Sequence, residues 1–166
     1  MKLSPTYKMP FKRRRLEKTD YRKRLKLVSS SKPRLVVRKS LRYITTQIIG
    51  FDKKGDKSLA GVTSKELKKI GWKFACDNLP AAYLTGLLIG KRAMKKKINE
   101  VILDAGLYPS TKGNRIYAAA KGAIDAGLKL PIGEEILPSE DRIKGKHISN
   151  DVEKEFEKIK QKILSD

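Results

Sequence analysis

The first third of the chain carries hydrophobic patterns that are typical of β-strands. An apolar β-branched run, Leu35–Val37, and an alternating run from Tyr43 to Phe51 predict two paired strands. Turn-forming residues at 52–56 precede a third stretch, Ser58 to Val62, which is expected to return antiparallel to the second. The pattern therefore predicts an antiparallel meander.

The pattern then changes to a helical period. Thr63 and Glu66 have the spacing of a capping box and predict a short helix that Gly71 ends. Asn78, followed by a proline, predicts the start of the longest helix, in which apolar residues repeat up to Lys95–Lys97. Its sequence Gly86–Arg92 partly resembles a phosphate-binding loop, but the spacing differs and the segment lies mid-helix. We interpret its two glycines as sites of close packing against the sheet.

A further strand and helix complete the predicted core. Val101–Leu103 is too short for a buried helix and predicts an interior strand, and Ile116 to Ala126 predicts a helix that Gly127 ends. A helical crossover between strands implies parallel pairing. The predicted fold is α/β, a mixed sheet with an antiparallel meander, helical crossovers and helices covering its faces.

The chain divides into three predicted parts: a basic N-terminal arm (1–33), the α/β core domain (34–131) and a C-terminal extension (132–166). Asn150 and Glu153 cap a terminal helix with one apolar stripe. Sequence leaves two alternatives for this stripe, which either docks on the protein's own sheet or binds a neighbouring protein. The basic stretch from Asp20 to Leu27 can form a short helix, expected to order on a partner because like charges oppose it.

Charge determines which partner the chain needs. The 166 residues carry 39 basic and 18 acidic side chains, a net charge of +21. Residues 1–42 hold +14 of this, residues 43–133 hold +9, and residues 134–166 hold −2. So large and uneven a positive charge indicates a polyanionic partner, with salt-dependent affinity for phosphates. The three parts are expected to have different partners.

Several classes of protein and site are disfavoured. No apolar run is long enough for a membrane span, and no secretory signal begins the chain, so a cytoplasmic protein without membrane contact is expected. One cysteine, Cys76, and one histidine, His147, cannot build a disulfide or a cysteine-histidine zinc site. The acids of the core are scattered, which predicts neither catalysis nor a bound metal or cofactor.

Two loops are candidate RNA contacts in addition to the arm. The hairpin from Arg38 to Tyr43 combines cations, a hydroxyl and an aromatic ring, which suits backbone contact and stacking on an unpaired base. The loop from Pro109 to Arg115 leads into a helix, where free backbone amides and a glycine would let a phosphate approach. An ordinary solvated turn and a plain connecting loop remain the alternatives. RNA is favoured over DNA because the chain has no helix-turn-helix or zinc-finger signature.

These features in order resemble a known family. The basic arm, the segment Arg34–Ser40, Gln47, and Arg115 opening an alanine-rich helix that ends Ala126-Gly127-Leu128 resemble the universal large-subunit ribosomal protein L-eighteen family, called L-five in eukaryotes. The resemblance covers residues 8–131, and residues 63–73 and 78–88 are similar to archaeal and eukaryotic members in particular.

The resemblance implies a non-enzymatic protein of the large ribosomal subunit with a ribonuclease-H-like topology. It implies that the protein binds 5S ribosomal RNA and attaches it to the large-subunit ribosomal RNA in the central protuberance, beside neighbouring large-subunit proteins. A nuclease of that shape would carry an acidic metal ligand on the first strand, where this chain has Arg38 and Lys39. A general nucleic-acid chaperone and an RNA-processing factor are the alternatives.

The resemblance places 5S contacts on the arm, on the hairpin and on the later loop, where charge and turn chemistry also place them. Leu41 and Tyr43 stand where the family commonly has asparagine and histidine, so base recognition at the hairpin tip is expected to differ. The predicted RNA-binding residues are Lys12, Arg13, Arg14, Arg15, Arg22, Lys23, Arg24, Arg34, Arg38, Lys39, Ser40, Arg42, Tyr43, Lys112, Gly113, Asn114 and Arg115.

Overall fold

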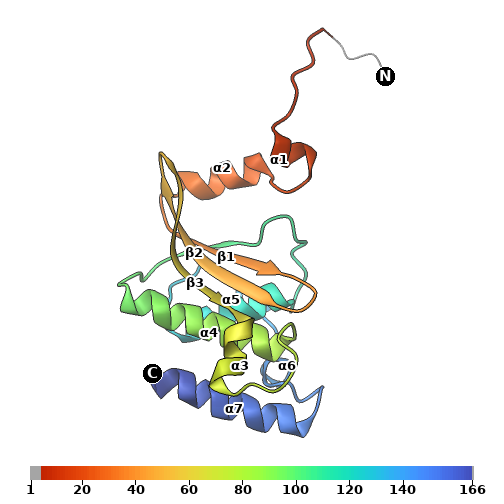
Figure 1. The fold of residues 1–166 in the computed structure, drawn as a ribbon, viewed down its shortest axis with the longest axis vertical. Helices are drawn as coiled ribbons and strands as arrows, with labels where there is room; N and C mark the ends of the chain where they lie inside the picture. The colour runs from red at the N-terminus through yellow and green to blue at the C-terminus, as the bar shows by residue number, and fades with distance from the viewer. Residues whose placement is uncertain (1–4, 166) are drawn as a thin grey trace.

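The computed structural model describes residues 5–165 and is α/β (Figure 1), as the sequence predicts. Four strands and the helices between and around them follow in an order close to the expected one. The elements are α1 (Lys12–Arg15), α2 (Tyr21–Ser29), β1 (Arg34–Lys39), β2 (Ile44–Asp52), β3 (Gly55–Thr63), η1 (Ser64–Glu66), α3 (Leu67–Ile70), α4 (Leu79–Lys95), β4 (Ile102–Asp104), α5 (Arg115–Asp125), η2 (Glu134–Ile136), α6 (Glu140–Lys144) and α7 (Asn150–Ser165).

The strands form one mixed sheet in the order β3-β2-β1-β4. β1 is antiparallel to β2 and β2 to β3, while β4 pairs parallel to β1, which confirms the predicted meander and crossover. The prediction of an interior strand at 101–103 is wrong, since β4 lies at the edge of the sheet. β3 begins three residues earlier than predicted because Asp52 pairs with Gly55 across a two-residue turn. After α5 the described chain adds no further strand, and only an isolated bridge joins Glu100 to Lys129.

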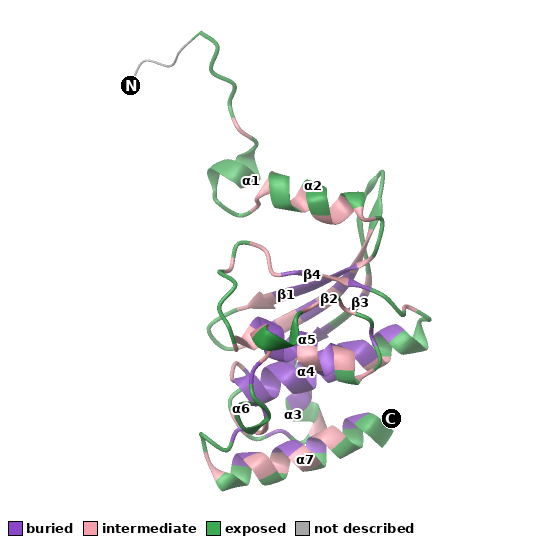
Figure 2. Ribbon diagram, turned by 180° about the vertical axis from the view of Figure 1, so that it is seen from behind, coloured by how far each residue is buried: buried purple, intermediate pink, exposed green. Residues whose placement is uncertain are grey.

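The main core lies between one face of the sheet and the helices α4 and α5. Alternation along β1 turns Leu35 and Val37 into this core and Arg34, Val36 and Arg38 to the opposite face. The prediction that helices cover both faces is correct for one face only, since the opposite face lies beside α2 alone (Figure 2). The two arginines on this face of β1 carry charges that need carboxylate partners rather than apolar neighbours. The apolar sides of α4 and α5 therefore pack on the other face of the sheet.

The apolar stripe of α7 packs on the outer side of the helix layer. Val152, Phe156, Ile159 and Ile163 are buried in a second core with Trp72 and residues of α4. The extension therefore docks on its own chain, but on helices rather than on the sheet, which corrects the first of the two sequence alternatives. As a result α4 is covered by the sheet and α5 on one side and by α7 on the other (Figure 2).

Two glycines allow α4 and α5 to approach each other closely. A Cβ at Gly86 would collide with the backbone carbonyl of Ala119, and a Cβ at Gly122 would collide with the carbonyl of Tyr83. The interpretation of Gly86 as a packing glycine is confirmed, although its neighbour is α5 rather than the sheet. Gly90 likewise faces Ala123 of α5 and Ala126, the residue just after that helix.

Substituting Gly86 by alanine is expected to destabilise the fold by about 2 to 3 kcal/mol, because the methyl group must displace helix backbone. Alanine would otherwise favour the helix by about 1 kcal/mol. Gly133→Ala is the matched control, since a Cβ there meets nothing within 4 Å. Urea unfolding followed by circular dichroism measures both, and equal midpoints would contradict the packing role.

Candidate nucleic-acid interface

The N-terminal segment presents a short, fully exposed cationic helix. All four residues of α1 are exposed, and within residues 5–165 no ion pair involves them. The ring of Phe11 lies 5.3 Å from that of Tyr21, which connects α1 to α2. Lys12, Arg13, Arg14 and Arg15 thus lie on the surface, where a phosphate can reach them, and their contact with RNA stays a prediction.

The helix α2 is held at its first turn by a side chain. Asp20 accepts hydrogen bonds from the backbone amides of Arg22 and Lys23, at 2.9 and 3.2 Å. The Lys23 amide, followed by that of Arg22 and by both cations, outweighs the opposing effect of burial and lowers the pKa of the Asp20 carboxyl. The expected short helix is therefore present in the chain alone, contrary to the expectation that it orders on a partner.

An ion-pair network joins α2 to three strands of the sheet. Arg24 Nη2 lies 2.8 Å from Asp56 Oδ2, and Arg34 Nη2 contacts the same oxygen at 2.9 Å. Arg34 Nη1 also contacts Asp104 Oδ2 at 3.1 Å. The other Asp104 oxygen accepts from Arg38 Nη2 at 2.9 Å. The network thus alternates cations and carboxylates across the sheet face that α4 and α5 leave free.

This network separates two arginines that the sequence treats alike. Arg34 is 3% exposed and contacts two carboxylates, so its side chain has no surface to offer to RNA. We therefore leave Arg34 out of the interface. The side chain of Arg38 is 42% exposed at the open end of the network, so Arg38 stays among the residues predicted to bind RNA. Sequence could not distinguish them, because both point to the same face of β1 and alternate with the core residues Leu35 and Val37.

The β1–β2 hairpin is a fixed turn with an open tip. The hydroxyl of Ser40 accepts from the Tyr43 amide and donates to the Tyr43 carbonyl. Lys39 Nζ lies 5.0 Å from the centre of the Tyr108 ring, whose hydroxyl donates to the Lys39 carbonyl. Arg42 is exposed at the tip. Tyr43 is half-buried against the second core, so less of its ring is open to a base than predicted.

The loop before α5 is built differently from the expectation. Asn114 caps α5 by accepting from the amides of Ile116 and Tyr117, and the Gly113 amide donates to the Ile136 carbonyl. These amides are therefore engaged, which corrects the expectation that they are free for a phosphate. Lys112 is exposed. Arg115, the first residue of α5, donates to the Asp77 carbonyl at 2.8 Å and contacts its carboxylate at 3.3 Å.

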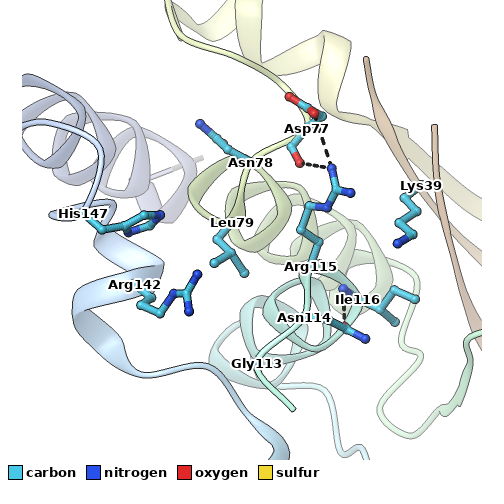
Figure 3. Close-up of a pocket in the computed structure, with 10 residues that line it drawn as sticks. All are labelled: Lys39, Asp77, Asn78, Leu79, Gly113, Asn114, Arg115, Ile116, Arg142 and His147. Atoms are coloured by element: carbon cyan, nitrogen blue, oxygen red, sulfur yellow. Dashed lines mark hydrogen bonds and ion pairs between the residues drawn. The ribbon is translucent and has the colours of Figure 1, made fainter. Parts of the chain in front are cut away.

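The hairpin and this loop meet at a cavity of about 450 Å³ that also borders the C-terminal extension (Figure 3). The sequence reasoning identified neither Arg142 nor His147, both of which point toward it (Figure 3). In the sequence, nothing marks these two residues as RNA-binding, because the segment 134–166 around them has a net negative charge. The lining residues are Lys39, Asp77, Asn78, Leu79, Gly113, Asn114, Arg115, Ile116, Arg142 and His147.

Most acids of the core are paired with cations of the same chain. Glu66 shows how: burial raises the pKa of its carboxyl, but the Thr63 amide and the Arg92 guanidinium outweigh burial, so the pKa lies below its usual value. Within residues 5–165 no three histidine, cysteine, aspartate or glutamate side chains gather into a metal site. Six of the seven core acids form ion pairs: Asp56, Glu66, Asp77, Glu100, Asp104 and Asp125.

Among the described helices none is long and apolar enough to cross a membrane. An α/β scaffold that uses its acids internally and exposes its cations on a helix, a hairpin and a loop defines a polyanion-binding protein.

Comparison with known proteins gives the particular family. The chain belongs to the ribosomal large-subunit family described as 60S L5 and 50S L18, whose model matches residues 5–100 and 95–133. It is 56% identical to the large ribosomal subunit protein uL18 of Korarchaeum cryptofilum, over 93% of this chain and 79% of that protein. It is 51% identical to uL18 of Methanococcus maripaludis, over 90% of this chain and 78% of that protein. The predicted family, its archaeal type and its place among large-subunit ribosomal proteins rather than enzymes are thereby confirmed.

The different placement of Arg34 and Arg38 leads to different expected losses of stability. Arg34→Gln should lower the free energy of unfolding by about 3 kcal/mol, since it leaves Asp56 and Asp104 without their buried partner. Arg38→Gln should cost about 1 kcal/mol or less, because its ion pair is half exposed. Urea titrations of both variants and of the unsubstituted protein measure the free energy of unfolding. Similar losses for the two variants would contradict the buried position of Arg34 and the exposed position of Arg38.

Proposed function

We propose that this protein binds 5S ribosomal RNA and attaches it to the large-subunit ribosomal RNA in the central protuberance. Its family membership supports the assignment to the large subunit. The RNA would lie along α1 and α2, the hairpin tip and the loop before α5. These three regions lie on the same side of the molecule in both opposite views, away from α7 (Figures 1 and 2).

One observation carries the proposal. The cations of α1, with Arg42 and Lys112, are exposed and have no carboxylate partner within residues 5–165. Unpaired cations on one side of a protein attract a polyanion and release its counterions on binding. The fixed hairpin turn adds shape to this charge, because the hydrogen bonds of Ser40 hold Lys39 and Arg42 in a defined relation. Shape and backbone contacts are how structured RNA is recognised.

The scaffold is proposed to be ribonuclease-H-like. The antiparallel meander β1–β3 with β4 parallel to β1 supports this topology. It carries no nuclease function here, because β1 presents Arg34, Arg38 and Lys39 where a metal-dependent nuclease would need an acid. Asp104 on β4 is engaged by two arginines, so an RNA-processing reaction has no free carboxylate at this face.

The proposed assembly includes neighbouring large-subunit proteins as further contacts, and the three-part division into arm (1–33), core (34–131) and extension (132–166) remains our prediction. A general nucleic-acid chaperone is the competing function, and it would bind any polyanion of similar charge density.

Discrimination between nucleic acids tests the function directly. At about 0.2 M KCl the protein should bind an archaeal 5S rRNA transcript at least about 100-fold more tightly than a duplex DNA of equal length. The reason is that the hairpin and the loop match one RNA shape, whereas charge alone does not distinguish the two. Filter binding with both ligands gives the ratio, and equal affinities would establish the chaperone function instead.

The helix α1 should supply several phosphate contacts. Replacing residues 12–15 by glutamine is expected to reduce the slope of log affinity against log salt by about 3, at roughly 0.7 to 0.9 per contact. A matched control replaces four exposed lysines away from the proposed surface, at the end of α4 and on α7, and should change the slope by much less: Lys95, Lys97, Lys154 and Lys158. If both variants lose the same slope, α1 makes no specific contact with the RNA.

A further inference from the structure

We infer that the C-terminal extension takes part in RNA binding, by completing a phosphate site with Arg142 and His147. This inference rests on the proposed function, since the phosphate belongs to the backbone of the bound 5S RNA. The site is the cavity between the hairpin, the loop before α5 and the extension (Figure 3). The net charge of the extension is negative, so its composition does not indicate a role in RNA binding.

Three cations and one imidazole, from four separate parts of the chain, border this cavity. Lys39 comes from the end of β1, Arg115 from the start of α5, Arg142 from α6, and His147 from the turn before α7. Figure 3 shows the guanidinium of Arg142 and the ring of His147 directed toward the space that Arg115 and Lys39 border from the other side. Convergence from distant segments is a property of the tertiary structure, because helical spacing along one element cannot produce it.

The positive charge around the cavity is not balanced from within. Asp77 is the one carboxylate among the ten lining residues, and Arg115 already pairs with it. Within residues 5–165 no ion pair involves Lys39, Arg142 or His147, and Asp141 beside Arg142 pairs with Lys146 instead. Cations directed at a shared space repel one another unless an anion lies between them. A phosphate supplies that charge and accepts several N–H bonds.

The extension is held firmly enough to position these side chains. Ile143, next to Arg142, is buried in the second core, and the α7 stripe packs beside it. Gly145 fits tightly, since a Cβ there would lie 2.7 Å from Val152 Cγ1 and 2.9 Å from Pro80 Cγ. The amide of Gly113 donates to the carbonyl of Ile136, which ties the loop to the extension. Arg142 and His147 are thus presented from a docked surface rather than from a free tail.

The first experiment measures affinity and its salt dependence with the full chain. Arg142→Gln should weaken binding to a 5S rRNA transcript about tenfold. The slope of log affinity against log salt should fall by about 0.7 to 0.9 because one phosphate contact is lost. Lys158→Gln is the matched control, since it removes the same charge from an exposed position of α7 that does not line the cavity. Identical behaviour of the two variants would overturn the inference.

The second experiment uses the single histidine of the sequence as a reporter. In protein labelled with ¹³C-histidine, the Cε1–H resonance belongs to His147 alone. It should shift when 5S rRNA is added to saturation, and an unchanged resonance in the bound complex would overturn the inference. Inorganic phosphate alone, at a few times the RNA concentration, should leave it unmoved. A full shift with phosphate alone would identify a site for the free anion and would likewise overturn it.

The two proposals fail in distinguishable ways. If the unsubstituted protein does not prefer 5S rRNA over duplex DNA, the proposed function fails. If it does prefer 5S rRNA while Arg142→Gln matches Lys158→Gln, the function stands and the extension has no part in binding.

Discussion

The close contact between α4 and α5 is the constraint on which the rest of the structure depends. Gly86 and Gly122 let each helix lie against the backbone of the other. This contact brings the N-terminal ends of α4 and α5 together. Arg115, at the start of α5, therefore donates a hydrogen bond to Asp77, just before α4, and forms an ion pair with it. The cavity, the loop and the base of the hairpin all take their positions from that junction. A wider separation would take Arg115 away from Asp77 and open the cavity.

The use of the acidic side chains follows the same logic. A chain with this excess of cations needs its acids wherever a cation lies inside the fold, and Arg34 takes two of them at once. Asp104 in turn serves both Arg34 and Arg38, and so connects β4 to β1 by charge as well as by backbone. Because the acids are occupied in this way, the cations of α1 and the hairpin tip remain for an external anion.

The C-terminal extension has a structural role that its composition does not show. Its apolar stripe covers the outer side of α4, which explains why α4 is apolar around most of its circumference. The same docking brings α6 and the turn before α7 to the edge of the cavity. A segment with net negative charge can thus place the cation Arg142 at this cavity, because position in the fold decides where a charge acts.

The sequence by itself determined the four strands, the helices α2, α4, α5 and α7, the mixed sheet and the class of partner, but not the short helices α1 and α6. Strand alternation, capping residues and the charge of the first forty-two residues are local properties, and each is visible in a short window. The tertiary structure alone decided that Arg34 is buried while Arg38 is exposed, and that α7 packs on helices rather than on the sheet. It also decided that Arg142 and His147 line the same cavity as Lys39 and Arg115. The physical reason is that burial and convergence depend on contacts between residues far apart in the chain, and local periodicity carries no information about them.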